Sequence, residues 1–116
     1  MEVVRRVVVT SSQVAIGTSN NYRWMIASGV MTIEASFVCD AGVVCTALVI
    51  DIEGSVTNNY FFALASHTLT ATELTNQACM FHIVDKPIVW VRSNIATLTQ
   101  TGVGDVKVTI DLLSYD

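Results

Sequence analysis

Two stretches of the chain place apolar side chains at every second position. One covers residues 31–39 and the other residues 106–112, and most of the positions between hold Thr, Glu, Ser, Lys or Asp. Successive side chains of a β-strand point to opposite faces, so this period of two predicts strands with one buried face. Tyr22, Trp24 and Ile26 predict a third, shorter strand of the same kind.

Four other runs are apolar at nearly every position. They cover residues 3–9, apart from two arginines, and residues 43–50, 60–65 and 88–91. Strands that are buried on both faces have this composition. We therefore expect these runs to form central strands of a sheet, or strands that lie in an interface.

Groups of turn-forming residues separate many of these runs at intervals of about 8–12 residues, a spacing typical of sandwiches and barrels. The single proline and the six glycines all fall within these groups. The groups are residues 17–21, 28–29, 40–42, 54–59, 85–87 and 102–104.

One segment favours a helix instead of a strand. Thr70 and Glu73 have the spacing of a capping box, in which each side chain accepts a hydrogen bond from the backbone of the other residue. We expect a single helical turn within residues 70–76. Together these patterns predict an all-β sandwich of eight or nine strands, with residues 1–116 forming one domain.

A short sequence echo occurs within the chain. Residues 19–22 (Ser-Asn-Asn-Tyr) are followed 38 residues later by residues 57–60 (Thr-Asn-Asn-Tyr). Asparagine tolerates left-handed backbone, so each copy predicts a loop that leads into a strand. Two similar loops of one sandwich explain the echo, and a duplicated half-domain is the alternative.

Composition excludes several classes of protein. The 116 residues are 52% hydrophobic and only 14% charged, where about 25% is usual, and disordered chains need the opposite balance. The net charge of −4 offers no basic surface to nucleic acid. The longest segment without Asp, Glu, Lys or Arg, residues 54–72, is too rich in Ser, Thr and Asn to cross a bilayer.

The charges are also few for the surface that they must cover. A folded monomer of 12.6 kDa exposes about 6,200 Å², so each of the sixteen charges would serve roughly 390 Å². Several runs are apolar on both faces as well, which one small sandwich cannot fully bury. We therefore expect an oligomer or a component of an assembly.

The chain has three cysteines, an odd number that favours a reducing compartment. Cys39 and Cys45 are the nearest pair, but a tight turn at residues 40–42 would place Cys39 opposite Val43 or Val44. We expect free, buried thiols. The N-terminal residues lack the apolar core of an export signal.

Metal-binding spacings do not occur. Cys79 and His82 are three residues apart in an expected strand, which points their side chains to opposite faces. His67 falls in an expected loop, where a surface histidine is common. We therefore expect no metal site and no cofactor.

Motifs for catalysis do not occur either. The chain has no Gly-x-Ser-x-Gly nucleophile motif and no Gly-rich phosphate loop. Gly102 and Gly104 lie between two expected strands and predict a hairpin turn. Asp51 and Glu53 share one face of a strand, whereas the acid pair of a glycosidase normally comes from different elements around a cleft. We expect no enzyme activity.

Five aromatic residues are the candidates for a binding surface: Trp90, Tyr60, Trp24, Tyr22 and Phe61. Aromatic side chains dominate both protein cores and the centres of interfaces. We favour these two roles, with Trp90 and Tyr60 as the first candidates for interface anchors. A platform on which sugars stack is the alternative.

The C-terminal part of the chain resembles a known class of proteins. Residues 87–94 (Pro-Ile-Val-Trp-Val-Arg-Ser-Asn) are followed by the Thr- and Gly-rich residues 97–102 and by the alternating strand 106–110. This arrangement is similar to the C-terminal ends of small tailed-bacteriophage virion proteins. The resemblance covers about a fifth of the chain, and its motifs are general features of β-sandwiches.

The resemblance implies a capsid decoration, or cement, protein with a jelly-roll-like fold of about eight strands. Such a protein would form a homotrimer, bind the major capsid protein and belong to a virion assembled in the host cytoplasm. It would need no cofactor, nucleic acid or membrane. The alternatives are a carbohydrate-binding module and a receptor-binding module of a phage tail or fibre tip.

Overall fold

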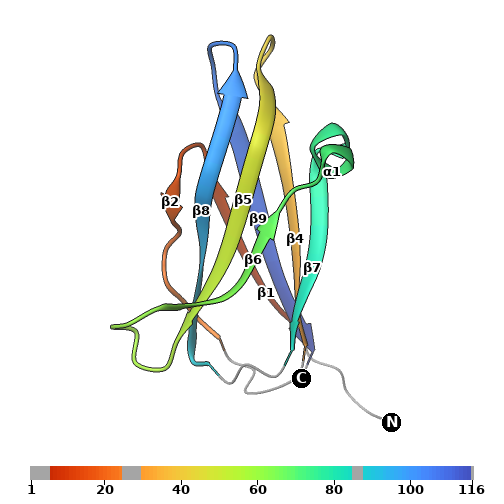
Figure 1. Cartoon of the computed structure of the whole chain (residues 1–116). Helices are drawn as coiled ribbons and strands as arrows, with labels where there is room; N and C mark the ends of the chain where they lie inside the picture. Colours follow the sequence, from red (N-terminus) through yellow and green to blue (C-terminus); the bar gives the residue numbers. More distant parts are fainter. Residues whose placement is uncertain (1–5, 25–29, 85–87, 116) are drawn as a thin grey trace.

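A computed structural model of the chain describes residues 6–24, 30–84 and 88–115, which form two antiparallel β-sheets and one helix (Figure 1). Residues 3–5, Ile26 and the expected turns at residues 28–29 and 85–87 lie outside the described residues. Across the first sheet, the strands are β1 (Arg6–Gln13), β9 (Val106–Tyr115), β4 (Val30–Cys39) and β7 (Ala78–Val84). Across the second, they are β2 (Gly17–Thr18), β8 (Trp90–Thr101), β5 (Val44–Ser55) and β6 (Phe62–Thr68), and β3 (Tyr22–Arg23) also pairs with β8.

The strand order is that of a jelly roll. Both β2 and β3 pair with β8, so they act as two pieces of one strand. Counted in this way the chain has eight strands. The first pairs with the last (β1 with β9), the second with the seventh (β2 and β3 with β8), the third with the sixth (β4 with β7) and the fourth with the fifth (β5 with β6). One long hairpin folded over into two sheets gives this order. The predicted all-β sandwich is confirmed.

The two alternating stretches are β4 and β9, which lie side by side in the first sheet. Ile33 of β4 and Ile110 of β9 are fully buried, whereas Glu34 and Lys107 face solvent. The inner faces of both sheets supply the core, and alternation therefore identified its residues correctly in these strands. The core residues are Trp24, Met31, Ile33, Ala35, Phe37, Val43, Cys45, Leu48, Ile50, Ile52, Leu69, Cys79, Ile83, Val91, Ile95, Val106, Val108, Ile110 and Leu112.

The apolar run at residues 43–50 is a central strand, as expected, but a bulge accounts for part of its composition. Cys45 and Leu48 are both buried, although side chains three residues apart should point to opposite faces. The register with β8 shifts here because Thr46 is an extra residue in β5. The bulge brings apolar residues on both sides of it to the inner face. Val44 stays on the outer face, where its side chain is 58% exposed.

Two of the other apolar runs lie at sheet edges, so the expectation of central strands is wrong for them. Residues 6–9 belong to β1 and residues 62–65 to β6, and each of these strands is the last in its sheet. Apolar composition favours a strand but does not fix its position in the sheet, which depends on pairing with distant segments. The interface alternative for these runs stays a prediction.

The expected hairpin at residues 102–104 is a connection between the two sheets. It joins β8 in the second sheet to β9 in the first, and the turn at residues 40–42 joins β4 to β5 in the same way. The two turns pack together at one end of the sandwich, at the top of Figure 1. A Cβ atom on Gly102 would lie 2.2 Å from the carbonyl oxygen of Gly42, so this contact requires glycine.

The predicted helix is α1 (Ala71–Asn76), and its capping box is present. The backbone N–H of Glu73 donates to Thr70 Oγ1 over 3.2 Å, and the backbone N–H of Thr70 donates to Glu73 Oε1 over 2.9 Å. Gln77 ends the helix in the left-handed conformation. The helix is too short to cross a membrane, and the described residues contain no helix that could do so.

Replacing Thr70 with Ala removes the hydroxyl of the N-cap and should lower the free energy of unfolding by about 1 kcal/mol. Urea unfolding followed by circular dichroism measures this. The matched control is Thr72→Ala, an exposed position in the first turn of the same helix, which should change stability by less than about 0.5 kcal/mol. Equal effects of the two substitutions would contradict the capping role.

Candidate functional site: an apolar hollow beside strand β6

An apolar hollow of about 300 Å³ lies beside the edge strand β6. Cavities of small-molecule and peptide sites begin at about this size. The part of its lining that belongs to the described residues contains no carboxylate, amine, imidazole or thiol. The lining residues are Gly54, Ser55, Val56, Thr57, Tyr60, Phe62, Leu64 and Ile88.

A glycine and a bulge create this hollow. The register between β5 and β6 shifts after Ile52, because Leu64 is an extra residue in β6. The shift pairs Phe62 with Gly54, which has no side chain of its own. A Cβ atom on Gly54 would lie 2.8 Å from Ile88 Cγ2 and 2.9 Å from Leu64 Cδ1, so the glycine lets these side chains approach the backbone.

Large apolar side chains surround the hollow and face solvent. Tyr60 is 73% exposed, Phe62 is 69% exposed and Val56 is 68% exposed. Single exposed apolar residues are ordinary, whereas a contiguous group beside an edge strand is typical of surfaces that bind a partner. We call Val56, Tyr60 and Phe62 the apolar rim.

The loop between β5 and β6 carries two of these residues and is held by local hydrogen bonds. The buried hydroxyl of Ser55 accepts hydrogen bonds from the backbone N–H groups of Thr57 and Asn58. Asn58 has a left-handed φ of 68°, and its side chain accepts a hydrogen bond from the Asn21 amide over 2.9 Å. The two loops of the sequence echo therefore touch each other. Figure 1 shows the β5–β6 loop reaching out at the lower left.

A second group of contacts holds Phe61 on the outer face of the second sheet. Arg92 Nε donates to Glu53 Oε1 over 2.6 Å, and the Arg92 guanidinium carbon lies 4.1 Å from the centre of the Phe61 ring. This cation–π contact packs Phe61 against β8. Phe61 is therefore half-buried, while its neighbours Tyr60 and Phe62 stay exposed.

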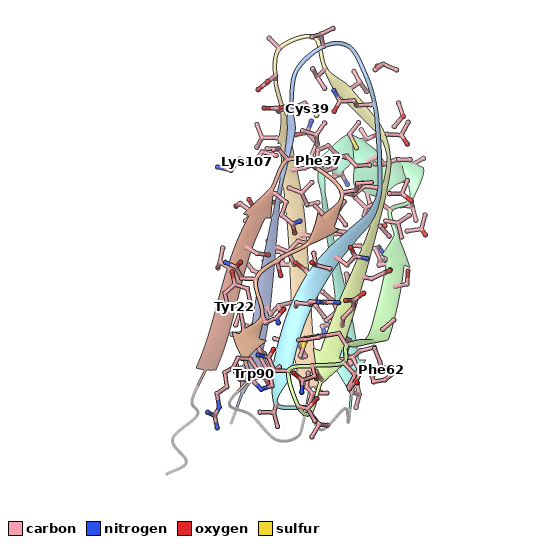
Figure 2. All side chains as sticks on the ribbon, turned by 90° about the vertical axis from the view of Figure 1, so that its left-hand side faces the viewer. Tyr22, Phe37, Cys39, Phe62, Trp90 and Lys107 are labelled. Carbon is pink, nitrogen blue, oxygen red and sulfur yellow. The ribbon has the colours of Figure 1, made fainter. Side chains whose placement is uncertain are left out.

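The five aromatic candidates from the sequence do not form one surface. Trp24 is only 6% exposed and belongs to the core, so its ring cannot contact a partner while the sandwich is folded. Tyr22 and Trp90 are half-buried on the paired strands β3 and β8. Figure 2 shows Tyr22, Trp90 and Phe62 in the lower half of the molecule, away from the end that carries Phe37, Cys39 and Lys107.

The sequence interpretation missed most of the hollow. It selected Tyr60 but not Phe62, Leu64 or Ile88, because an unbroken apolar run does not reveal which residues face the core. The run of three aromatic residues at positions 60–62 was the available signal. Assigning their faces needed the position of the bulge, which depends on β5.

Comparison with known proteins adds a likeness of fold. No known protein family matches the sequence, and no curated protein does. Among solved structures, the chain is similar to the SPBc2 prophage-derived protein YomS, with 14% identity and a TM-score of 0.57, over 98% of this chain and 97% of that chain.

Two further likenesses are looser. One is to a chain of the cyanophage Pam1 capsid, with 13% identity, a TM-score of 0.44 and coverage of 97% and 84% of the two chains. The other is to a chain of Bacillus endospore appendages, described as disulfide-linked pili, with 14% identity, a TM-score of 0.43 and coverage of 93% and 86%. At identities this low, the likeness to YomS shows a shared fold.

The different burial of Trp24 and Tyr60 predicts different costs of truncation. Trp24→Ala should lower the free energy of unfolding by about 3–5 kcal/mol, because it leaves a cavity in the core. Tyr60→Ala should change it by less than about 0.5 kcal/mol, because the ring is exposed. Denaturant unfolding of both variants measures the difference. A large loss for Tyr60→Ala would mean that this ring supports the fold of the monomer.

Proposed function

We propose that this chain is a non-enzymatic structural protein of a bacteriophage virion, and specifically a capsid decoration protein. The observation that carries the proposal is the apolar rim, formed by Val56 and Tyr60 of the β5–β6 loop and by Phe62 at the start of the edge strand β6. The near full-length likeness of fold to a prophage-derived protein supports the phage context. A jelly roll serves many functions, so the surface, more than the fold, carries the argument.

The rim and its surroundings suit a protein partner. The centres of protein interfaces are rich in aromatic residues and poor in charge. Glu53 and Arg92 near the rim neutralise each other, so association would gain little from electrostatic attraction and much from burial of apolar area.

The proposed partners are other copies of the chain, in a homotrimer, and the major capsid protein of a shell assembled in the host cytoplasm. A decoration protein that binds the assembled shell and not its free subunits stabilises the shell by mass action. It needs no catalytic group for this. The residues that we propose to contact a partner are Tyr60, Phe62 and Val56 of the rim first, and Trp90, Tyr22 and Phe61 after them.

A carbohydrate-binding or receptor-binding module is less well supported. Sugar sites combine an aromatic platform with several polar groups that fix the hydroxyls. In the lining described here, the hydroxyl of Ser55 already accepts two backbone hydrogen bonds, which leaves Thr57 and Tyr60 as the polar side chains. Saturable binding of a glycan by the isolated protein would nevertheless favour this alternative and count against decoration.

Phe62→Ser tests the rim in self-association. Sedimentation velocity of the native chain should give a mass above the 12.6 kDa of one copy, and Phe62→Ser should shift it to the monomer at equal concentration. The matched control is Met80→Ser, which removes a side chain of similar exposure, 57%, from the outer face of the other sheet and should leave the mass unchanged. An unchanged mass for Phe62→Ser would show that the rim is not the self-association surface.

The decoration role has its own test with particles. Shells that carry the native chain should withstand heating and osmotic shock that open shells prepared without it, and labelled chain should be found across the whole shell. Tyr60→Ser should bind such shells at least about 30-fold more weakly, as expected for an interface hot spot of 2 kcal/mol. Equal survival of both kinds of shell, or label confined to the tail or one vertex, would overturn the proposal.

A further inference from the structure

Three side chains with metal-binding atoms meet at the open edge of the sandwich, away from the hollow. His67 comes from β6, Glu73 from α1 and Cys79 from β7. One ligand atom from each lies within 4.8 Å of the others. Figure 1 shows α1 bridging β6 of one sheet and β7 of the other at this place.

The fold holds each of these side chains in place. His67 pairs with Ile50 and Cys79 with Ala35, two core residues, so both side chains are on the inner face of their sheets. The His67 ring stacks on Phe81, with ring centres 4.9 Å apart. Such packing fixes the direction of a potential ligand before any ion binds.

The capping box orients the third group. Glu73 Oε1 accepts a hydrogen bond from the backbone N–H of Thr70 over 2.9 Å and one from His67 Nε2 over 3.0 Å. The backbone bond is the main reason that the pKa of Glu73 lies below its usual value, and this carboxylate is therefore charged at neutral pH. Ligating carboxylates commonly have such a second hydrogen bond, which tunes and positions them.

We propose that His67, Glu73 and Cys79 form a binding site for one divalent transition-metal ion of the zinc type. Imidazole, thiolate and carboxylate together suit Zn²⁺, whereas Mg²⁺ and Ca²⁺ prefer oxygen ligands alone. Three protein ligands leave the fourth tetrahedral position to water. The inference does not depend on the proposed function.

The geometry needs only a small adjustment. Zinc bonds of about 2.0–2.3 Å at tetrahedral angles place ligand atoms roughly 3.4–3.7 Å apart. The present 3.0 Å between His67 and Glu73 must widen slightly, and the largest separation, at most 4.8 Å, must shrink by about 1 Å. Rotation of the half-buried His67 and Glu73 side chains can supply both changes.

Metal binding changes the protonation of Cys79 and His67. Burial, and after it the negative charge of Glu73, raises the pKa of Cys79 to about 11, so without metal this thiol is protonated. Binding of the ion forms a metal–sulfur bond and releases the thiol proton to solvent. The ion binds Nε2 without a proton, so the proton that Nε2 donates to Glu73 in the metal-free chain goes to solvent and the imidazole holds its one proton on Nδ1.

Residue spacing along single strands, on which the sequence analysis relied, does not reach this cluster. Cys79 is buried and His82 exposed, so these two residues do face opposite ways. The partners of Cys79 instead come from other elements, six and twelve residues earlier in the chain. A bound ion would connect the two sheets at an edge where no strand pairing joins β6 to β7.

Titration of the full-length, tag-free chain with Co²⁺ tests the proposal, after treatment with a chelator. We expect one ion per chain, the visible bands of tetrahedral cobalt and a thiolate-to-cobalt charge-transfer band in the near ultraviolet. Cys79→Ser should lose that band, whereas Cys45→Ser, at another buried thiol, should keep it. Absence of the band from the native chain, or its persistence in Cys79→Ser, would overturn the proposal.

Zinc should also raise the unfolding temperature of the native chain. His67→Gln and Glu73→Gln should each weaken zinc binding by at least about tenfold, the loss that even indirect metal partners produce. Glutamine at position 73 preserves the capping box, so this variant should still fold if Cys79→Ser does not. His82→Gln is the matched control and should bind as the native chain does. Equal zinc affinity in all of these variants would show that the triad is only a hydrogen-bonded cluster.

Discussion

The register between β5 and β6, set by the single extra residue Leu64, determines both functional surfaces that we propose. A strand that slips by one residue exchanges its two faces. On one side of the bulge, His67 lies opposite the buried Ile50 and is therefore directed toward α1 and β7. On the other side, Phe62 lies opposite Gly54, against which Ile88 and Leu64 pack as part of the lining of the hollow. Without the bulge, Ala63 would take the place of Phe62 opposite Gly54, and the apolar rim would lose the phenylalanine ring.

The two ends of the edge strand β6 have different surroundings. A free edge presents unpaired backbone groups and invites contact with other chains. At the end near His67, the helix α1 and the inward-facing side chains link β6 to β7, so this part of the edge is occupied. At the other end, next to the apolar rim, no described strand pairs with the outer edge of β6, and this end is open to a partner. One strand thus has a closed part that supports the fold and an open part available for assembly.

The small number of charged residues agrees with an apolar open part of β6. Only 14% of the residues are charged, and two of the charges near the rim, Glu53 and Arg92, form an ion pair. Contacts made by such a surface depend on apolar area and shape, and salt screens them weakly. Two buried hydroxyl groups have hydrogen-bond partners: that of Ser114 donates to the carbonyl oxygen of Val30, and that of Ser93 lies 3.2 Å from the hydroxyl of Ser11.

The sequence alone determined those features that depend on neighbouring residues. The period of two fixed the buried faces of β4 and β9, and the spacing of Thr70 and Glu73 fixed the start of α1, because strand faces and helix caps are local geometry. The tertiary structure decided which sheet each strand joins, and so turned the expected hairpin at residues 102–104 into a connection between sheets. It also placed the bulge at Leu64 and brought His67, Glu73 and Cys79 together. These features depend on pairing and burial summed over segments far apart in the chain, which no local pattern encodes.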